Sequence, residues 1–176
     1  MAVSKLWLIN EGGLSRVLQY AANPKKTNNK LYVNGINCEP ETAYEEFTAV
    51  KHSYAKTGGI EAYHGYLSFK EQDITPELSL KIGTEFAQEV WGKRFQILVT
   101  VHTDTEHSHC HFVINSVSFV DGKKLWGEEK AWFKFKQTAD RLCEKYGLYY
   151  NPKPVRGKSS SYHYNRAKTG EPTRHL

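Results

Sequence analysis

The chain has 176 residues, enough for one domain whose core removes roughly two thirds of the unfolded surface from water. No apolar stretch approaches the roughly 20 residues of a membrane span, and the first residues lack the plan of a secretory signal, so we expect a cytoplasmic protein without membrane insertion. The net charge of +5 comes entirely from residues 151–176, which hold six Lys or Arg and one acidic residue, leaving 18 of each sign in residues 1–150.

The first half of the chain alternates segments typical of strands and of helices. Residues 3–9 alternate as a strand does, and two glycines follow them. The apolar residues of 14–21 then recur at the i, i+3, i+4, i+7 spacing of a helix, which an Asn-Pro pair ends. Residues 31–38 predict a short strand or hairpin, residues 40–54 a helix with proline near its first position, and residues 61–69 another strand.

The second half predicts two helices around a β-hairpin. Residues 75–91 begin with a threonine cap and a proline, and their apolar residues repeat every four positions. Two apolar runs, 95–101 and 112–117, flank a polar link, and residues 132–146 predict a final helix. Strands and helices alternate, yet the central pair is a hairpin. We therefore predict an α+β fold, a central antiparallel sheet with helices packed on one face and a metal site on the open face.

Four histidines lie within ten residues in the predicted hairpin, in the string VHTDTEHSHCHFVIN. His109 and His111 share a face because side chains alternate along a strand, and His102, at the end of the partner strand, can join them. Neutral imidazole is the commonest metal ligand, and three protein ligands leave positions open for catalysis. We predict a metal site of these three histidines, with His107 set apart in the turn. The alternative is a group of polar residues on a solvated face.

The three cysteines do not predict a site of their own. Their number is odd and no CxxC pair is present, which argues against a structural zinc site and a disulfide framework. Cys110 alternates with the histidines, so we expect it to face the core beneath the sheet.

A metal beside a basic surface suggests phosphoryl transfer, which requires an attacking group. Tyr20 lies about 110° from the centre of the apolar stripe on its predicted helix, so it is not a core member of that helix. Lys25 and Lys26 follow it and would favour both a phosphate and a phenolate. An ordinary surface tyrosine remains the alternative.

The C-terminal segment interleaves cations with aromatic rings at Tyr162 and Tyr164. This composition suits single-stranded nucleic acid, where cations meet phosphates and rings stack on bases, but it equally fits a solvated, disordered end. We expect a catalytic domain in residues 1–150 and a basic extension in residues 151–176 that contacts DNA and continues into a longer native protein. The expected DNA contacts in the extension are Lys153, Arg156, Lys158, Arg166 and Lys168.

Several motifs together resemble one known family. One motif runs from His102 to Asn115 and contains Asp104, His107, His109 and His111. It is similar to the third motif of conjugative relaxases of the MobA/MobL and P-type mobilisation class. These belong to the HUH endonucleases, whose two histidines flank a hydrophobic residue, as in His109-Cys110-His111. The segment LSRVLQYAANPKKT resembles the first motif of that family, and AYHGYLSF its middle motif. The resemblance covers most of residues 3–165 and includes GKKLWGEEK and RLCEKYGL, as found in mobile elements of Gram-positive bacteria.

This resemblance implies a bacterial enzyme that nicks and rejoins one strand of an origin of transfer, through a 5′-phosphotyrosyl intermediate and without a nucleotide cofactor. It implies Mn²⁺ or Mg²⁺ as cofactor, and the histidine ligands would favour Mn²⁺. The implied partners are origin-of-transfer DNA, auxiliary relaxosome proteins and a coupling protein. Alternatives are a rolling-circle replication initiator or a transposase-type tyrosine nickase, a metal-dependent phosphodiesterase using activated water, and a non-catalytic DNA-binding module.

The resemblance also assigns roles to individual residues. Tyr20 would be the nucleophile, and Asp104 would either orient a histidine or help to deprotonate the tyrosine, whose hydroxyl ordinarily has a pKa near 10. His102, His109 and His111 would be the metal ligands. The expected DNA contacts outside the extension, followed by two second-tier candidates, are Lys25, Lys26, His64 and Ser68, then His107 and Asn115.

Overall fold

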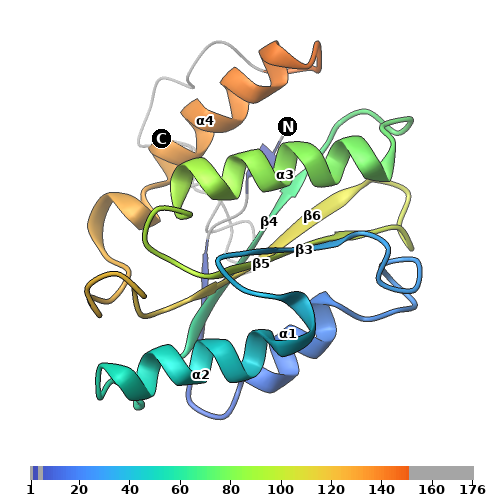
Figure 1. Cartoon of the computed structure of the whole chain (residues 1–176). Coiled ribbons are helices and arrows are strands. Elements are labelled where there is room, and N and C mark those ends of the chain that lie inside the picture. The colour runs from blue at the N-terminus through green and yellow to red at the C-terminus, as the bar shows by residue number, and fades with distance from the viewer. Residues whose placement is uncertain (1, 4–5, 151–176) are drawn as a thin grey trace, which may run out of the picture.

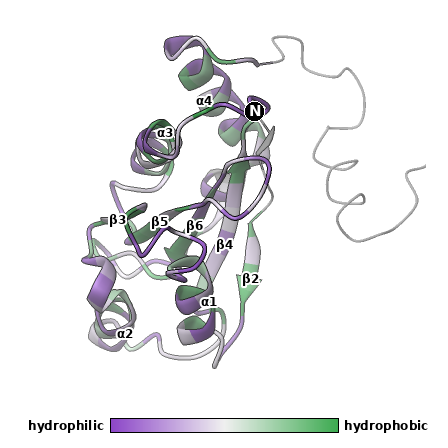
Figure 2. Ribbon diagram, turned by 90° about the vertical axis from the view of Figure 1, so that its right-hand side faces the viewer, coloured by the Kyte–Doolittle hydropathy of each residue, from purple (hydrophilic) through white to green (hydrophobic). Residues whose placement is uncertain are grey.

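An antiparallel sheet forms the centre of the structure, a computed structural model that describes residues 2–3 and 6–150. Its strands lie in the order β1-β4-β6-β5-β3, and β2 pairs with β4 as well, so β1 and β2 share one edge (Figures 1 and 2). In chain order the strands are β1 (Ala2–Val3), β2 (Trp7–Ile9), β3 (Val33–Ile36), β4 (Ala62–Ser68), β5 (Ile97–His102) and β6 (His109–Asn115).

The predicted hairpin is confirmed as β5 and β6, which pair antiparallel with His102 opposite His109. Because side chains alternate, Val99, Val101 and Phe112 face one side of the sheet, while the histidines face the other. Both strands are buried along nearly their whole length, since the sheet is covered on its two sides.

Helices α3 (Pro76–Val90) and α4 (Trp132–Lys145) cover the first side, where the larger hydrophobic core lies (Figure 1). Thr75 caps α3 by accepting a 3.2 Å hydrogen bond from the backbone N–H of Leu78, as its sequence predicts. The ring of Trp91 packs edge-on against Phe112 and Phe135, at centroid distances of 5.6 and 5.4 Å. The prediction that Cys110 faces this core is confirmed, because its thiol is fully buried there.

Helices α1 (Leu14–Ala21) and α2 (Ala43–Ser53), the latter preceded by a short 3₁₀ turn (Pro40–Thr42), pack on the opposite side. The α+β class and the antiparallel sheet are confirmed, but helices lie on both faces rather than on one. The physical reason is that the sheet also presents apolar side chains here, Leu98 and Val113, and the apolar stripe of α1 covers them. The histidines lie on this same face, next to the C-terminal end of α1.

Two polar contacts, one half-buried and one buried, fix α1 and α2 on the sheet. The carboxylate of Glu61 accepts a 3.0 Å hydrogen bond from the backbone N–H of Leu14, at the start of α1. Lys51 of α2 donates to the amide oxygen of Asn115, whose amide nitrogen donates to Phe47 and Gln96. Burial lowers the pKa of Lys51 to about 8.

A second 3₁₀ turn, Gly127–Lys130, precedes α4. In the part of the chain that the structure describes, no helix is long and apolar enough to cross a membrane.

Candidate active site

The sheet register gathers the histidines into neighbouring rows on the face that α1 borders. His102, His109 and Ser68 lie side by side on β5, β6 and β4. The next row contains Thr100, His111 and Tyr66 in the same strand order. His64 lies two residues before Tyr66 on β4, so it shares this face. Four imidazoles from three strands therefore meet on one surface.

His111 is the centre of this histidine cluster. Its ring centroid lies 4.0 Å from that of His102 and 5.3 Å from that of His64, and Nδ1 of His111 lies 3.0 Å from Nε2 of His64. The centroid of His109 is 6.3 Å away, and the two rings are nearly perpendicular. Burial, reinforced by the neighbouring histidines, lowers the pKa of His111 to about 2, so this imidazole stays neutral at any working pH.

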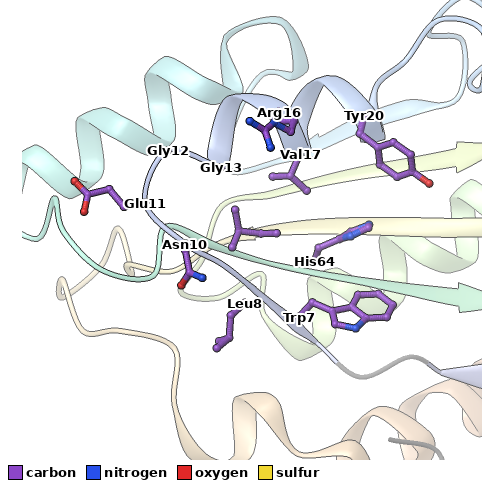
Figure 3. Close-up of a pocket in the computed structure, with 11 residues that line it drawn as sticks. Trp7, Leu8, Asn10, Glu11, Gly12, Gly13, Arg16, Val17, Tyr20 and His64 are labelled. Carbon is purple, nitrogen blue, oxygen red and sulfur yellow. The ribbon is translucent and has the colours of Figure 1, made fainter. Parts of the chain in front are cut away.

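Tyr20 lies in the last turn of α1, next to His64 (Figure 3). Its ring packs edge-on against those of His102, His111 and His64, at centroid distances of 5.4, 6.0 and 6.1 Å. The side chain nevertheless stays 45% exposed, as its place on the helical wheel predicts. His102 Nε2 donates a 2.9 Å hydrogen bond to the carbonyl oxygen of Ala21, which ties the end of α1 to the hairpin. The hydrogen bond to Ala21, the residue after Tyr20, thus positions the tyrosine.

A lysine and a carboxylate flank Tyr20 on the loop side. Lys26 Nζ lies 5.5 Å from the centroid of the Tyr20 ring and 2.8 Å from a carboxylate oxygen of Asp104. This hydrogen bond lowers the pKa of Asp104 and raises that of Lys26, so both stay charged at neutral pH. The loop is held in place because Thr103 N–H donates to the carbonyl oxygen of Lys26 at 2.7 Å. The hydrogen-bond partner of the Asp104 carboxylate is therefore Lys26.

The predicted metal ligands have the right donors on one surface, but they do not form a closed coordination shell. No three His, Cys, Asp or Glu side chains in the described residues are arranged to hold a metal ion. Because His102 donates from Nε2, its Nδ1 keeps a lone pair for a metal, and Nε2 of His111 is not used in its contact with His64. Beside them, the fully buried hydroxyl oxygen of Thr100 has no partner among the described residues. Imidazole nitrogens are donors that a divalent transition metal accepts, so the chemistry of these side chains suits such an ion.

The remaining predicted residues fall into three groups. Ser68 and His64 lie on the histidine face, and exposed Lys25 precedes Lys26 in the loop after α1. His107 lies in the turn between β5 and β6, and Asn115 lies away from the cluster beneath α2. The predicted contacts of the basic extension lie outside the described residues, namely Lys153, Arg156, Lys158, Arg166 and Lys168.

Sequence reasoning placed His64 among DNA contacts and did not single out the aromatic residues around it. Trp7 of β2 is the register partner of His64, and its ring stacks on that of Tyr66 with centroids 5.7 Å apart. The available signal was the alternation of His64, Tyr66 and Ser68 along one strand, which places all three on one face.

Comparison with known proteins identifies a family for this chain. Residues 20–148 match the family described as "Relaxase: MobA/VirD2-like, nuclease domain". One Protein rlx of Staphylococcus aureus is 35% identical over 148 residues, which are 84% of this chain and 44% of that protein. A second Protein rlx of the same species is 32% identical over 168 residues, which are 96% of this chain and 48% of that protein. The chain thus spans about half the length of the curated relatives it matches.

A solved structure shares the fold. It comes from work on the molecular basis of vancomycin resistance transfer in Staphylococcus aureus, and it matches with a TM-score of 0.55 over 85% of this chain and 97% of that chain. The two sequences are 11% identical, so this likeness concerns the arrangement of helices and strands alone.

The family match begins at Tyr20 and includes the whole histidine hairpin. The chain therefore belongs to the MobA/VirD2-like relaxases and contains their nuclease domain.

Proposed function

We propose that the chain nicks and rejoins one DNA strand at an origin of transfer, through a covalent bond between Tyr20 and the 5′ phosphate at the nick. The supporting observation is the packing of an exposed tyrosine edge-on over three imidazoles, at centroid distances of 5.4 to 6.1 Å. An accessible hydroxyl beside imidazole nitrogens that could hold a metal suits tyrosine attack on a phosphodiester. The proposed catalytic domain comprises residues 1–150.

In the proposed reaction, Tyr20 loses its proton to a base and its oxygen forms a bond to phosphorus. The bond from phosphorus to the 3′ oxygen breaks, and that oxygen takes up a proton to become a free 3′-hydroxyl. Asp104 is the candidate base, and the ammonium of Lys26 offsets the negative charge of the phosphate and of the phenolate. One phosphate ester replaces another, so the strand can be rejoined by the reverse step without a nucleotide cofactor.

The proposed cofactor is Mn²⁺ or Mg²⁺, held by His102, His109 and His111. When bound there, the ion would polarise an oxygen of the scissile phosphate. Imidazole donors favour Mn²⁺ over Mg²⁺, which prefers oxygen ligands. His64 and Ser68 would contact DNA at the border of this site, and Lys25 would contact its backbone. We also expect auxiliary relaxosome proteins and a coupling protein to act on the same DNA.

The test measures formation of a covalent protein–DNA adduct in the presence of Mn²⁺. The substrates are end-labelled single strands that together cover both strands of the genetic element encoding the chain. We expect a labelled protein–DNA adduct and a free 3′ end at one position. Tyr20→Phe should form no adduct, because it lacks the attacking oxygen. Tyr44→Phe is a matched control, since Tyr44 on α2 is 46% exposed and Tyr20 is 45% exposed.

An adduct that persists in Tyr20→Phe would assign the nucleophile elsewhere. Cleavage that persists without any adduct would instead favour hydrolysis by an activated water. A chain that forms its adduct on a replication-origin strand rather than an origin-of-transfer strand would belong to the replication initiators in function.

The metal assignment is tested separately by titrating Mn²⁺ and measuring the free ion by its electron paramagnetic resonance signal. His111→Ala and His109→Ala should weaken Mn²⁺ binding and abolish metal-dependent cleavage while leaving the circular dichroism spectrum unchanged. His52→Ala on α2 is the control, because this exposed histidine lies outside the cluster. Equal Mn²⁺ affinity in all variants would rule out this ligand set.

A further inference from the structure

A cavity of about 730 Å³ opens directly beside Tyr20 and His64 (Figure 3). It lies between β2, the loop of residues 10–13 and α1, and its size is in the range of ligand sites in proteins. The proposed reaction uses the phosphate at Tyr20 but leaves this space without a role. Because the cavity adjoins the attacking hydroxyl, whatever occupies it lies next to the reacting phosphate.

Aromatic rings lie on the side of the cavity that adjoins the histidines. The ring of Trp7 forms part of the wall and is stacked on Tyr66, with an interplanar angle of 28°. It also lies 5.5 Å from His64, tilted by 43°. Aromatic faces of this kind stack on nucleic-acid bases. The wall therefore suits a flat, apolar ring such as a base.

A cation, Arg16 of α1, also borders the cavity (Figure 3). Arg16 precedes Tyr20 by four residues, which places it one turn earlier on the same helix face, about 6 Å along the axis. Arg16 is exposed, and no acidic side chain among the described residues forms an ion pair with it. Its charge is thus available to a phosphate.

We propose that this cavity is the subsite for the nucleotide next to the scissile phosphate. The base packs against Trp7, and Arg16 binds the backbone phosphate that neighbours the one attacked by Tyr20. This assignment rests on the proposed nicking function, because Tyr20 sets the position of the scissile phosphate. A base can enter the cavity only when it is not paired within a duplex, so the subsite makes the enzyme select single-stranded DNA at this position.

The base contact is tested by photo-crosslinking the Tyr20→Phe chain to oligothymidine strands that each carry a single 5-iodouracil. We expect mass spectrometry to place a crosslink on Trp7, and Trp7→Ala to lose it. Trp126→Ala is the matched control, because this tryptophan is 77% exposed and lies in the segment before α4. Crosslinks that form only at other residues, with the same yield in Trp7→Ala, would overturn the assignment.

The phosphate contact is tested with Arg16→Ala, an exposed substitution that does not depend on the folding of β2. The slope of log affinity against log salt for an oligothymidine strand should fall by about 0.7, the value for one phosphate contact on single strands. Arg141→Ala on α4 should keep the slope, because that arginine pairs with Glu89 on the other side of the sheet. An unchanged slope in Arg16→Ala would refute the phosphate contact.

These measurements separate the two proposals because they need no cleavage. A Trp7 crosslink in a chain that never forms an adduct would refute the nicking function and leave the base subsite standing. Adduct formation at Tyr20 together with an unchanged crosslink pattern in Trp7→Ala would support the nicking function and refute the base subsite.

Discussion

At the scale of single residues, Tyr20 is held over the histidines by contacts at both ends of its helix. Glu61 accepts a hydrogen bond from the first turn of α1, and His102 donates one to the carbonyl oxygen of Ala21 in the last turn. The tyrosine ring itself needs no hydrogen bond to be placed, and its hydroxyl can remain accessible to substrate. His102 positions the helix through Nε2, which leaves its Nδ1 for the proposed metal.

Lys26 is the residue whose removal most directly tests the electrostatics around Tyr20. Its ammonium lies 5.5 Å from the ring centroid and bonds to Asp104, so Lys26→Met removes a positive charge and leaves that carboxylate unpaired. We expect the single-turnover cleavage rate at saturating DNA to fall about tenfold, which corresponds to about 1.4 kcal/mol. Lys26→Arg should keep most of the rate.

The control for this substitution is Lys30→Met, which makes the same change of charge in the same loop but at an exposed position. It should weaken DNA binding at most slightly and leave the single-turnover rate unchanged. Equal rates in Lys26→Met and the wild type would show that the Lys26–Asp104 pair is only structural.

At the scale of elements, the contact of α3 with β6 holds the histidine strand in place from the face opposite the histidines. A Cβ atom at Gly83 of α3 would lie 2.0 Å from the sulfur of Cys110, so only glycine allows the helix to approach this closely. Cys110 alternates with His109 and His111, which means that the same strand supplies the core contact and the site.

Gly83→Ala should therefore destabilise the domain by about 1–3 kcal/mol through overpacking, measured as the free energy of unfolding in urea. Cys110→Ala removes the sulfur and leaves the nearest contact at 3.1 Å, to the Cβ of that residue. The double variant should therefore lose less stability than the sum of the two single variants. Strict additivity would mean that the two side chains do not interact.

The elements also show what could be predicted from local sequence. The β5–β6 hairpin and the α1 stripe rest on spacings within one element or its neighbour, so both were predicted correctly. His64 meets His111 through the β4–β6 register, across 47 residues, and Lys26 meets Asp104 across 78. Local periodicity contains no information on such pairings. The second helical layer was missed because Leu98 and Val113 lie within continuously apolar strands that do not reveal a second buried face.

At the scale of the whole molecule, the two faces of the sheet have different tasks. The face beneath α3 and α4 is filled with aromatic and aliphatic side chains, whereas the other is divided between the α1–α2 layer and the histidine cluster. Sites built on strands of a packed sheet hold their side chains more rigidly than sites on loops. The proposed centre depends on a loop only for Lys26 and Asp104.

The distribution of charge over the whole chain leads to the last prediction. Residues 1–150 carry equal numbers of acidic and basic residues, and all six cations of residues 151–176 lie beyond position 152. Deleting residues 152–176 should therefore weaken binding to single-stranded DNA and flatten its salt dependence, by about 0.7 in the log–log slope for each phosphate that the extension would otherwise bind. The adduct at Tyr20 should still form at low salt, because every residue of the proposed centre is retained. A truncated chain with the full salt slope would show that the basic extension does not contact DNA.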